Sequence, residues 1–154
     1  MLRVPAPSIF METQAAIEVR LIEPANIQGI VPLLQQRNCA LSSQLLSARV
    51  AEMAAQGFQC FGAYHQNRLV GMAGFWIKTR YHTGRVIEPD AVFVEESYRS
   101  RGIGERMTRC ILEYGKQREC LESELHCYVS NAAAHRFWMN QGYCIIALHF
   151  GKDL

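Results

Sequence analysis

Two glycines spaced one residue apart lie between a strand-like run and a helix-like run of this chain. They are Gly102 and Gly104 in YRSRGIGERM (98–107), which also carries arginines on both sides of them. The first turn of a helix has unpaired backbone N–H groups and a partial positive charge. Glycines just before it let the backbone approach an anion closely. The stretch therefore predicts a strand–loop–helix unit with a phosphate site at the helix N-terminus.

Two familiar phosphate loops do not fit this stretch. The Walker loop requires Lys and then Ser or Thr after its last glycine, whereas Glu105 follows Gly104 here. The dinucleotide-binding fingerprint requires a third glycine at the position of Met107. The remaining match is Arg/Gln-x-x-Gly-x-Gly/Ala, which begins at Arg99.

Hydrophobic periodicity places this loop in a chain of alternating strands and helices. His65–Arg68 reads as the turn of a β-hairpin, and Pro89 predicts a bulge or break inside its strand. The predicted class is α/β (α+β), with a mixed sheet and helices on both faces. We expect an N-terminal arm over 1–15 and one domain over 16–154. The predicted strands cover 17–22, 58–64, 69–78, 85–94, 121–129 and 143–150, and the predicted helices cover 26–34, 43–55, 102–116 and 131–141.

Composition excludes several other classes of protein. The net charge of +2 is too small to indicate nucleic acid or a membrane surface as a partner. The six cysteines include no C-x-x-C pair, which argues against a zinc site and a secreted disulfide scaffold. No apolar run reaches the length of about 20 residues that spans a bilayer. We expect a cytoplasmic protein without a metal.

A second motif, NAAAHRFWMNQGY (131–143), begins 27 residues after Gly104. With the loop it resembles the two signatures of the GNAT superfamily of acetyl-CoA-dependent N-acetyltransferases, the second being Asn-x-x-Ala-x-x-Phe/Leu-Tyr-x-x-x-Gly-Phe. The residues in register are Asn131, Ala134, Phe137, Gly142 and Tyr143. The expected order of strands and helices is also that of the GNAT fold, over residues 16 to 154.

The resemblance implies a central sheet of six to seven strands flanked by about four helices. It also implies that acetyl-CoA is the co-substrate, that loop N–H groups hold its pyrophosphate, and that the strand before the loop pairs with its pantetheine arm. The residues that the resemblance places at the coenzyme A site are Phe93, Val94, Arg99, Arg101, Gly102, Ile103, Gly104, Glu105, Arg106, Asn131, Ala134, Phe137 and Trp138.

Acetyl transfer to an amine requires a group that takes up the amine proton. Glu88 and Asp90 precede the loop at positions where family members carry acidic residues, and both are candidates for this general base. A carboxylate in a partly dry cleft can have its pKa raised into the useful range. Either residue could instead bind a cationic amine without taking its proton.

The general acid is the point at which this chain departs from the family. The tyrosine that often protonates the leaving thiolate is replaced by Trp138, whose indole N–H has no useful acidity. The candidate acid is Tyr128, with Tyr143, Cys127 and His135 as further alternatives.

The expected function is transfer of an acetyl group from acetyl-CoA to a primary amine of a small molecule or peptide, by direct attack in a ternary complex. The segments 38–43 and 78–85 carry few acids, which disfavours a strongly cationic acceptor. Two alternatives remain: an acetyl-CoA-binding module with weak or no activity, and an acyltransferase that uses another acyl-CoA. The protein is expected to be a monomer or homodimer.

Overall fold

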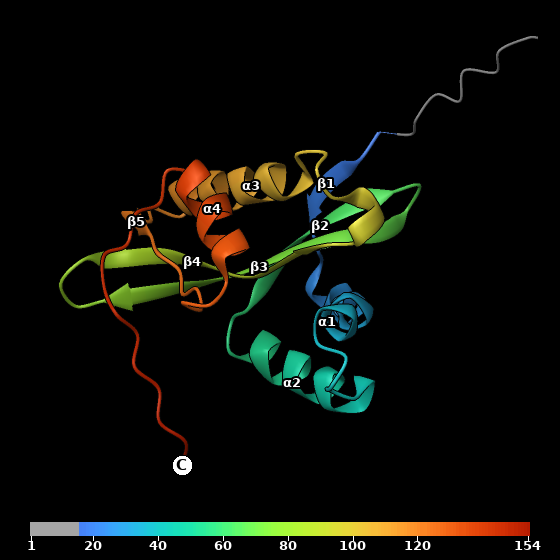
Figure 1. The fold of residues 1–154 in the computed structure, drawn as a ribbon, viewed down its shortest axis with the longest axis horizontal. Helices are drawn as coiled ribbons and strands as arrows, with labels where there is room; N and C mark the ends of the chain where they lie inside the picture. Colours follow the sequence, from blue (N-terminus) through green and yellow to red (C-terminus); the bar gives the residue numbers. More distant parts are fainter. Residues whose placement is uncertain (1–15) are drawn as a thin grey trace, which may run out of the picture.

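An antiparallel meander forms most of the sheet in the computed structural model, which describes residues 16–154 (Figure 1). Strands β1 (Glu18–Leu21), β2 (Gln59–His65), β3 (Arg68–Arg80) and β4 (Gly84–Val94) pair in sequence order. The short strand β5 (Glu122–Ser123) then pairs with β4 in parallel, which makes the sheet mixed. The turn between β2 and β3 contains Gln66 and Asn67 with positive φ, as a two-residue hairpin of the primed kind requires.

Helices cover both faces of this sheet (Figure 1). On one face, a 3₁₀ segment (Pro24–Ile30), α1 (Val31–Arg37) and α2 (Ser43–Ala55) enclose an apolar cluster that includes Ile30, Val50 and Met72. On the other face, α3 (Ile103–Gln117) packs on a second cluster. Helix α4 (Ala132–Asn140) follows β5, and a 3₁₀ turn (Glu96–Tyr98) joins β4 to the glycine loop. None of the helices in residues 16–154 is long and apolar enough to cross a membrane.

Close packing fixes α3 against β4. A Cβ atom placed on Gly115 would lie 2.8 Å from Cγ2 of Ile87, so only glycine lets the helix approach the strand this closely. Ile87 is almost fully buried and belongs to the α3-side cluster. The last turn of α3 is thus held against β4, and Ile103 and Met107 anchor its first turns in the same cluster.

The sheet has five strands in the described residues, so the expectation of six to seven strands is wrong for this part of the chain. Residues 143–150 alternate apolar and polar side chains but form no strand, and the side chains of Ile145, Leu148 and Phe150 are exposed to solvent. A strand requires a partner ladder, and this segment has none there. The predicted strand 121–129 is likewise reduced to β5, because its backbone leaves β4 after Glu124 donates its N–H to the carbonyl of Ile87.

Two further local expectations differ from the structure. The helix expected over 26–34 is a 3₁₀ segment that runs into α1, because Pro24 starts the first turn and Asn26 does not act as its cap. The expected irregularity in β4 is present but lies beyond Pro89, which pairs in register with Phe75. The extra residue falls after Asp90, where Ala91 has a φ of 51°. The arm expected over 1–15 lies outside the described residues.

Candidate active site

The glycine loop forms the N-terminus of α3. Gly102 is the N-cap residue and has a φ of 71°, a left-handed conformation that favours glycine. The first intrahelical bond runs from the N–H of Arg106 to the carbonyl of Gly102. The N–H groups of the preceding turn therefore point out of the helix end, as an anion site requires.

A hollow of ≈ 440 Å³ lies in front of this helix end. Its walls come from the end of β4, the loop, the first turn of α3 and the last turn of α4. The residues that line it are Val94, Tyr98, Arg99, Ser100, Gly102, Ile103, Gly104, Glu105, Phe137, Asn140 and Gln141. The structure thus brings together residues from both sequence motifs, seven of which were predicted for the coenzyme A site.

The three arginines of the loop differ in how they are held. Arg99 donates from Nε to the carbonyl of Val94, at 2.9 Å, and its guanidinium lies over the ring of Phe93. Arg101 donates to the carbonyl of Ser97 at 3.0 Å, and Arg106 donates across to Ile17 next to β1 at 2.9 Å. Arg99 is therefore the one of the three that lines the hollow.

Helix α4 supplies the opposite wall through its aromatic residues. Asn131 caps this helix, because its side-chain oxygen accepts the N–H of Ala134 at 3.0 Å. The ring of Phe137 lies beside Gly104, 3.4 Å from where a Cβ atom would stand. Trp138 packs edge-on against Phe137 and Tyr143, with ring centroids 4.9 and 5.3 Å away. The indole thus fills the position at which the family often carries a tyrosine.

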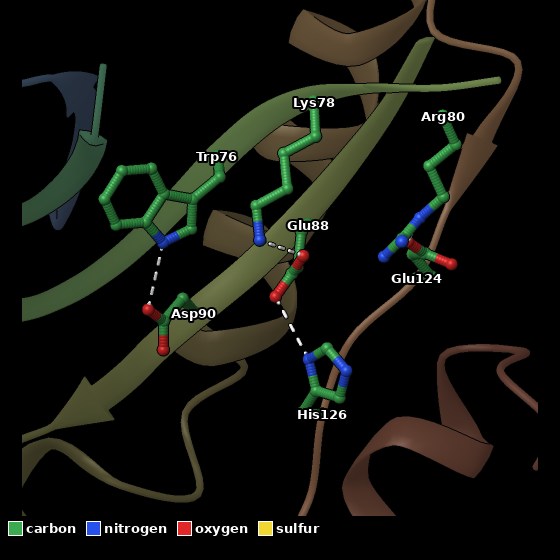
Figure 2. A network of polar contacts seen from close by, with 7 residues as sticks. All are labelled: Trp76, Lys78, Arg80, Glu88, Asp90, Glu124 and His126. Atoms are coloured by element: carbon green, nitrogen blue, oxygen red, sulfur yellow. Dashed lines mark hydrogen bonds and ion pairs between the residues drawn. The ribbon is translucent and has the colours of Figure 1, made fainter. Parts of the chain in front are cut away.

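The candidate acids Glu88 and Asp90 lie on the same face of β4, as Figure 2 shows. Trp76 and Gly74 of β3 are their direct pairing partners, so the regular ladder extends through Pro89. The indole Nε1 of Trp76 donates to Oδ2 of Asp90 at 3.1 Å. This face of the sheet is the α2 side, because Trp76 also packs on Phe58 in the apolar cluster of that side.

Glu88 is the most enclosed charged group on this face, with 7% of its surface exposed. Lys78 Nζ contacts its Oε2 at 2.6 Å, and Nδ1 of His126 lies 3.1 Å from its Oε1. Burial raises the pKa of this carboxyl, but the hydrogen bond and charge of Lys78, with the contact to His126, outweigh burial and leave the pKa below its usual value. Glu88 is thus held ionised with both oxygens engaged.

His126 reaches Glu88 across the fork between β4 and the segment after β5. Strands β4 and β5 pair as far as Ile87 and Ser123. After the hydrogen bond from the N–H of Glu124 to the carbonyl of Ile87, the contacts across the fork come from side chains. His126 is half-exposed, and the ring of His149 lies 4.3 Å from its ring, centroid to centroid. Arg80 and Glu124 form a neighbouring ion pair on the same side (Figure 2).

Sequence reasoning identified the two acids but missed Lys78 and His126 as their partners. A usable signal was present, since Glu122, Glu124 and His126 place polar side chains at every second position of a predicted strand. The candidate acid Tyr128 is 83% exposed, on the segment between β5 and α4, and its assignment stays a prediction. Residues 16–154 hold no group of three or more His, Cys, Asp or Glu that could bind a metal.

An open helix N-terminus at a strand fork, with a polar face beside it, is an arrangement that fits a protein of the acyltransferase class. A sequence model of the Acetyltransferase (GNAT) family matches residues 32–143, and the chain belongs to this family. It is 28% identical over 138 residues to glucosamine 6-phosphate N-acetyltransferase 1 of Oryza sativa subsp. japonica, covering 80% of this chain and 84% of that one.

Solved structures show the same fold at low sequence identity. An aminoglycoside N-acetyltransferase, AAC(6')-Iy, in complex with CoA superposes with a TM-score of 0.78 at 17% identity, covering 90% of this chain and 95% of that one. Glucosamine-6-phosphate N-acetyltransferase from Arabidopsis thaliana superposes with a TM-score of 0.70 at 16% identity, covering 90% and 98%. The family assignment and the solved CoA complex support an acyl-CoA as co-substrate.

Proposed function

We propose that this protein transfers an acetyl group from acetyl-CoA to a primary amine of a small molecule or peptide, by direct attack in a ternary complex. The observation that carries the proposal is the hollow at the α3 N-terminus, which both sequence motifs line and which opens beside the free edge of β4. Unpaired N–H groups and Arg99 supply the charge complement for a pyrophosphate there.

The bond changes of this reaction set the demands on the site. The amine nitrogen attacks the thioester carbonyl carbon, a C–N bond forms, and the C–S bond breaks with its electron pair going to sulfur. The amine loses a proton to a base, and the coenzyme A thiolate takes one up from solvent or from a protein group. The polar face of β3 and β4 lies beside the fork (Figure 2). Phe93 and Val94, the proposed partners of an extended pantetheine arm, follow on the same strand.

Acceptors of moderate charge fit this face best. Its acids are each matched by a donor, since Lys78 contacts Glu88, Arg80 contacts Glu124 and Trp76 contacts Asp90. A balanced surface offers no strong attraction to an acceptor that carries several positive charges. An amino sugar phosphate, the substrate in the names of two related proteins, belongs among the first compounds to test.

The replacement of the family tyrosine by Trp138 motivates the second reading, a coenzyme A-binding module with little or no activity. A thiolate is a sufficiently good leaving group to depart without that tyrosine, so the enzyme reading is preferred.

Thiol release from acetyl-CoA tests these readings directly. Purified full-length protein is assayed with a panel of amines that includes glucosamine 6-phosphate, amino acids, polyamines and N-terminal peptides, and each product is confirmed by mass spectrometry. Propionyl-CoA and longer acyl-CoA thioesters run in parallel test the choice of donor. Release with at least one amine supports the enzyme. Coenzyme A binding without release on any amine supports the module, and no coenzyme A binding overturns both.

A further inference from the structure

The contacts of Glu88 make it a poor acceptor for a proton. One of its carboxylate oxygens is bound to an ammonium group and the other faces an imidazole nitrogen. A general base works best when it binds a proton near the working pH, whereas the pKa of this carboxyl is held below its usual value. Glu88 is suited instead to hold a partner.

His126 is that partner. With Nδ1 3.1 Å from a carboxylate whose pKa is held below its usual value, the ring is favoured in the tautomer that carries its proton on Nδ1. The lone pair is then on Nε2, at the opposite edge of the ring. Within residues 16–154 no hydrogen-bond partner occupies Nε2, and 49% of the side chain is exposed. Imidazole is the side chain best matched to proton transfer near neutral pH.

We propose that His126 is the general base of the reaction and that Glu88 is its positioning residue. Nε2 of His126 takes the proton that the amine loses as the C–N bond forms, and the charge of Glu88 stabilises the imidazolium that results. The proton is passed on to solvent or to the leaving thiolate, which restores the neutral ring. This inference rests on the proposed acetyl transfer.

Several charged or titratable groups face this pair and enter its pH dependence. They are Lys78 on β3, His149 on the C-terminal segment, and the Arg80–Glu124 pair that joins β3 to the residue after β5. Lys78 helps to keep Glu88 ionised, so that Glu88 accepts a hydrogen bond from the Nδ1–H of the ring without taking that proton.

Substitution of His126 gives the first test. His126→Ala should lower kcat at least ~100-fold at neutral pH, the usual size of a general-base contribution, with the KM for acetyl-CoA nearly unchanged. Added imidazole should restore part of this rate, and the acid limb of the pH profile should change. His82→Ala removes an exposed histidine of the β3–β4 turn and should match the wild type in each respect. Coenzyme A titration calorimetry confirms that each variant folds.

The ring itself supplies the second test, which requires no acceptor. In the wild type, ¹⁵N NMR should show His126 with its proton on Nδ1. Glu88→Gln should move the ring toward the other tautomer and lower kcat by about 10-fold or more, without rescue by imidazole, because the ring is still present. A purely structural role for Glu88 would not move the tautomer.

The outcomes separate this inference from the proposed function. If the wild type releases thiol and His126→Ala does so equally fast, His126 is not the base, and the acetyltransferase stands. If His126→Gln, a second variant, keeps the full rate, the inference is likewise overturned. If the wild type acts on no amine, the proposed function fails and the catalytic role of His126 fails with it.

Discussion

Nδ1 of His126 lies 3.1 Å from Oε1 of Glu88, although the two residues are 38 positions apart in the sequence. The contact closes the fork between β4 and the segment after β5 just where backbone pairing ends. Burial of a charged side chain destabilises the fold unless its polar atoms have hydrogen-bond or charge partners. Lys78 on β3 provides the second partner of Glu88. The polar network of Figure 2 therefore depends on the register of β3 and β4 and on the position of the segment after β5.

Removal of the charge on Lys78 should raise the pKa of Glu88. Burial, which raises this pKa, remains in Lys78→Met, whereas the main group that lowers it is lost. An NMR titration of the Glu88 carboxyl carbon measures the shift. The control is Lys116→Met, which breaks an exposed pair with Glu113 on α3 and should leave the Glu88 titration unaltered. An unchanged titration in Lys78→Met would show that Lys78 does not hold the carboxylate.

The same variant should change how stability depends on pH. A carboxyl with a lowered native pKa stabilises the fold fully above the usual value of 4.5, and this stabilisation is lost as the pH falls through the native value. Lys78→Met should therefore flatten the acid side of the stability profile below that pH. Urea unfolding followed at several pH values provides the measurement, with Lys116→Met again expected to track the wild type.

An acidic side chain at Gly104 should weaken acetyl-CoA binding. Gly104 lines the hollow at the α3 N-terminus, so Gly104→Asp places a negative charge where the pyrophosphate is expected. We expect at least ~10-fold weaker binding by calorimetry, about 1.4 kcal/mol. Unfolding should be little affected, since an acid in the first turn suits the helix dipole.

Gly104→Ala is the matched control for this charge. Its Cβ atom would stand 3.4 Å from the ring of Phe137, an ordinary contact, so binding should change only a few-fold. If the two variants lose the same affinity for acetyl-CoA, the cause is the presence of a side chain at this position and not its charge. Unchanged affinity in Gly104→Asp would count against the loop as the phosphate site.

The strands and helices with strong local patterns were predictable from the sequence. The meander, α2 and α3 follow from apolar periodicity. The structure adds a cap to α2, where the hydroxyl of Ser42 accepts the N–H of Leu45. The failures lie where tertiary contacts decide. Residues 143–150 alternate as a strand does, but no neighbouring strand within residues 16–154 pairs with them. The pairing of β5 with β4 ends after two residue pairs.

The part of the candidate site that is proposed to hold the acetyl donor was predictable from the sequence. The glycine loop and the α4 motif are local sequence patterns, and the structure places them around one hollow. The polar half was only partly predictable, because the environment of Glu88 depends on Lys78 and His126 from two other parts of the chain. The alternation of Glu122, Glu124 and His126 assigns their side chains to one face but does not report which residue they contact, so the chemistry of Glu88 could not be deduced from its position in the strand.

A methyl group at Gly74 should destabilise the fold beside the polar network. Its Cβ atom would lie 2.2 Å from the ring of Phe58 and 2.9 Å from the backbone oxygen of Asp90. Phe58 is buried and packs on Trp76, so it cannot move aside freely. We expect Gly74→Ala to lower the free energy of unfolding by about 1–3 kcal/mol in urea denaturation. Gly29→Ala, which meets no atom within 4 Å, is the control, and equal stability of the two variants would contradict the packing argument.

Loss of the charge on Asp90 should weaken amine binding more than turnover. Asp90 is exposed, and only its Oδ2 is drawn to the Trp76 indole, so its charge can attract a protonated amine. Asp90→Asn keeps an oxygen for that indole but removes the charge. We expect the KM for the amine to rise about 5- to 10-fold, as for a partly exposed ion pair of roughly 1 kcal/mol, with kcat nearly unchanged.

Steady-state kinetics at two salt concentrations check this role for Asp90. Because salt screens exposed charges, the difference between the wild type and Asp90→Asn should shrink as ionic strength rises. Asp153→Asn, which removes an exposed carboxylate near the C-terminus, should leave both constants unchanged. A fall in kcat of ~100-fold with an unchanged amine KM would instead identify Asp90 as the base, because a lost proton acceptor slows the chemical step and not the binding of the amine.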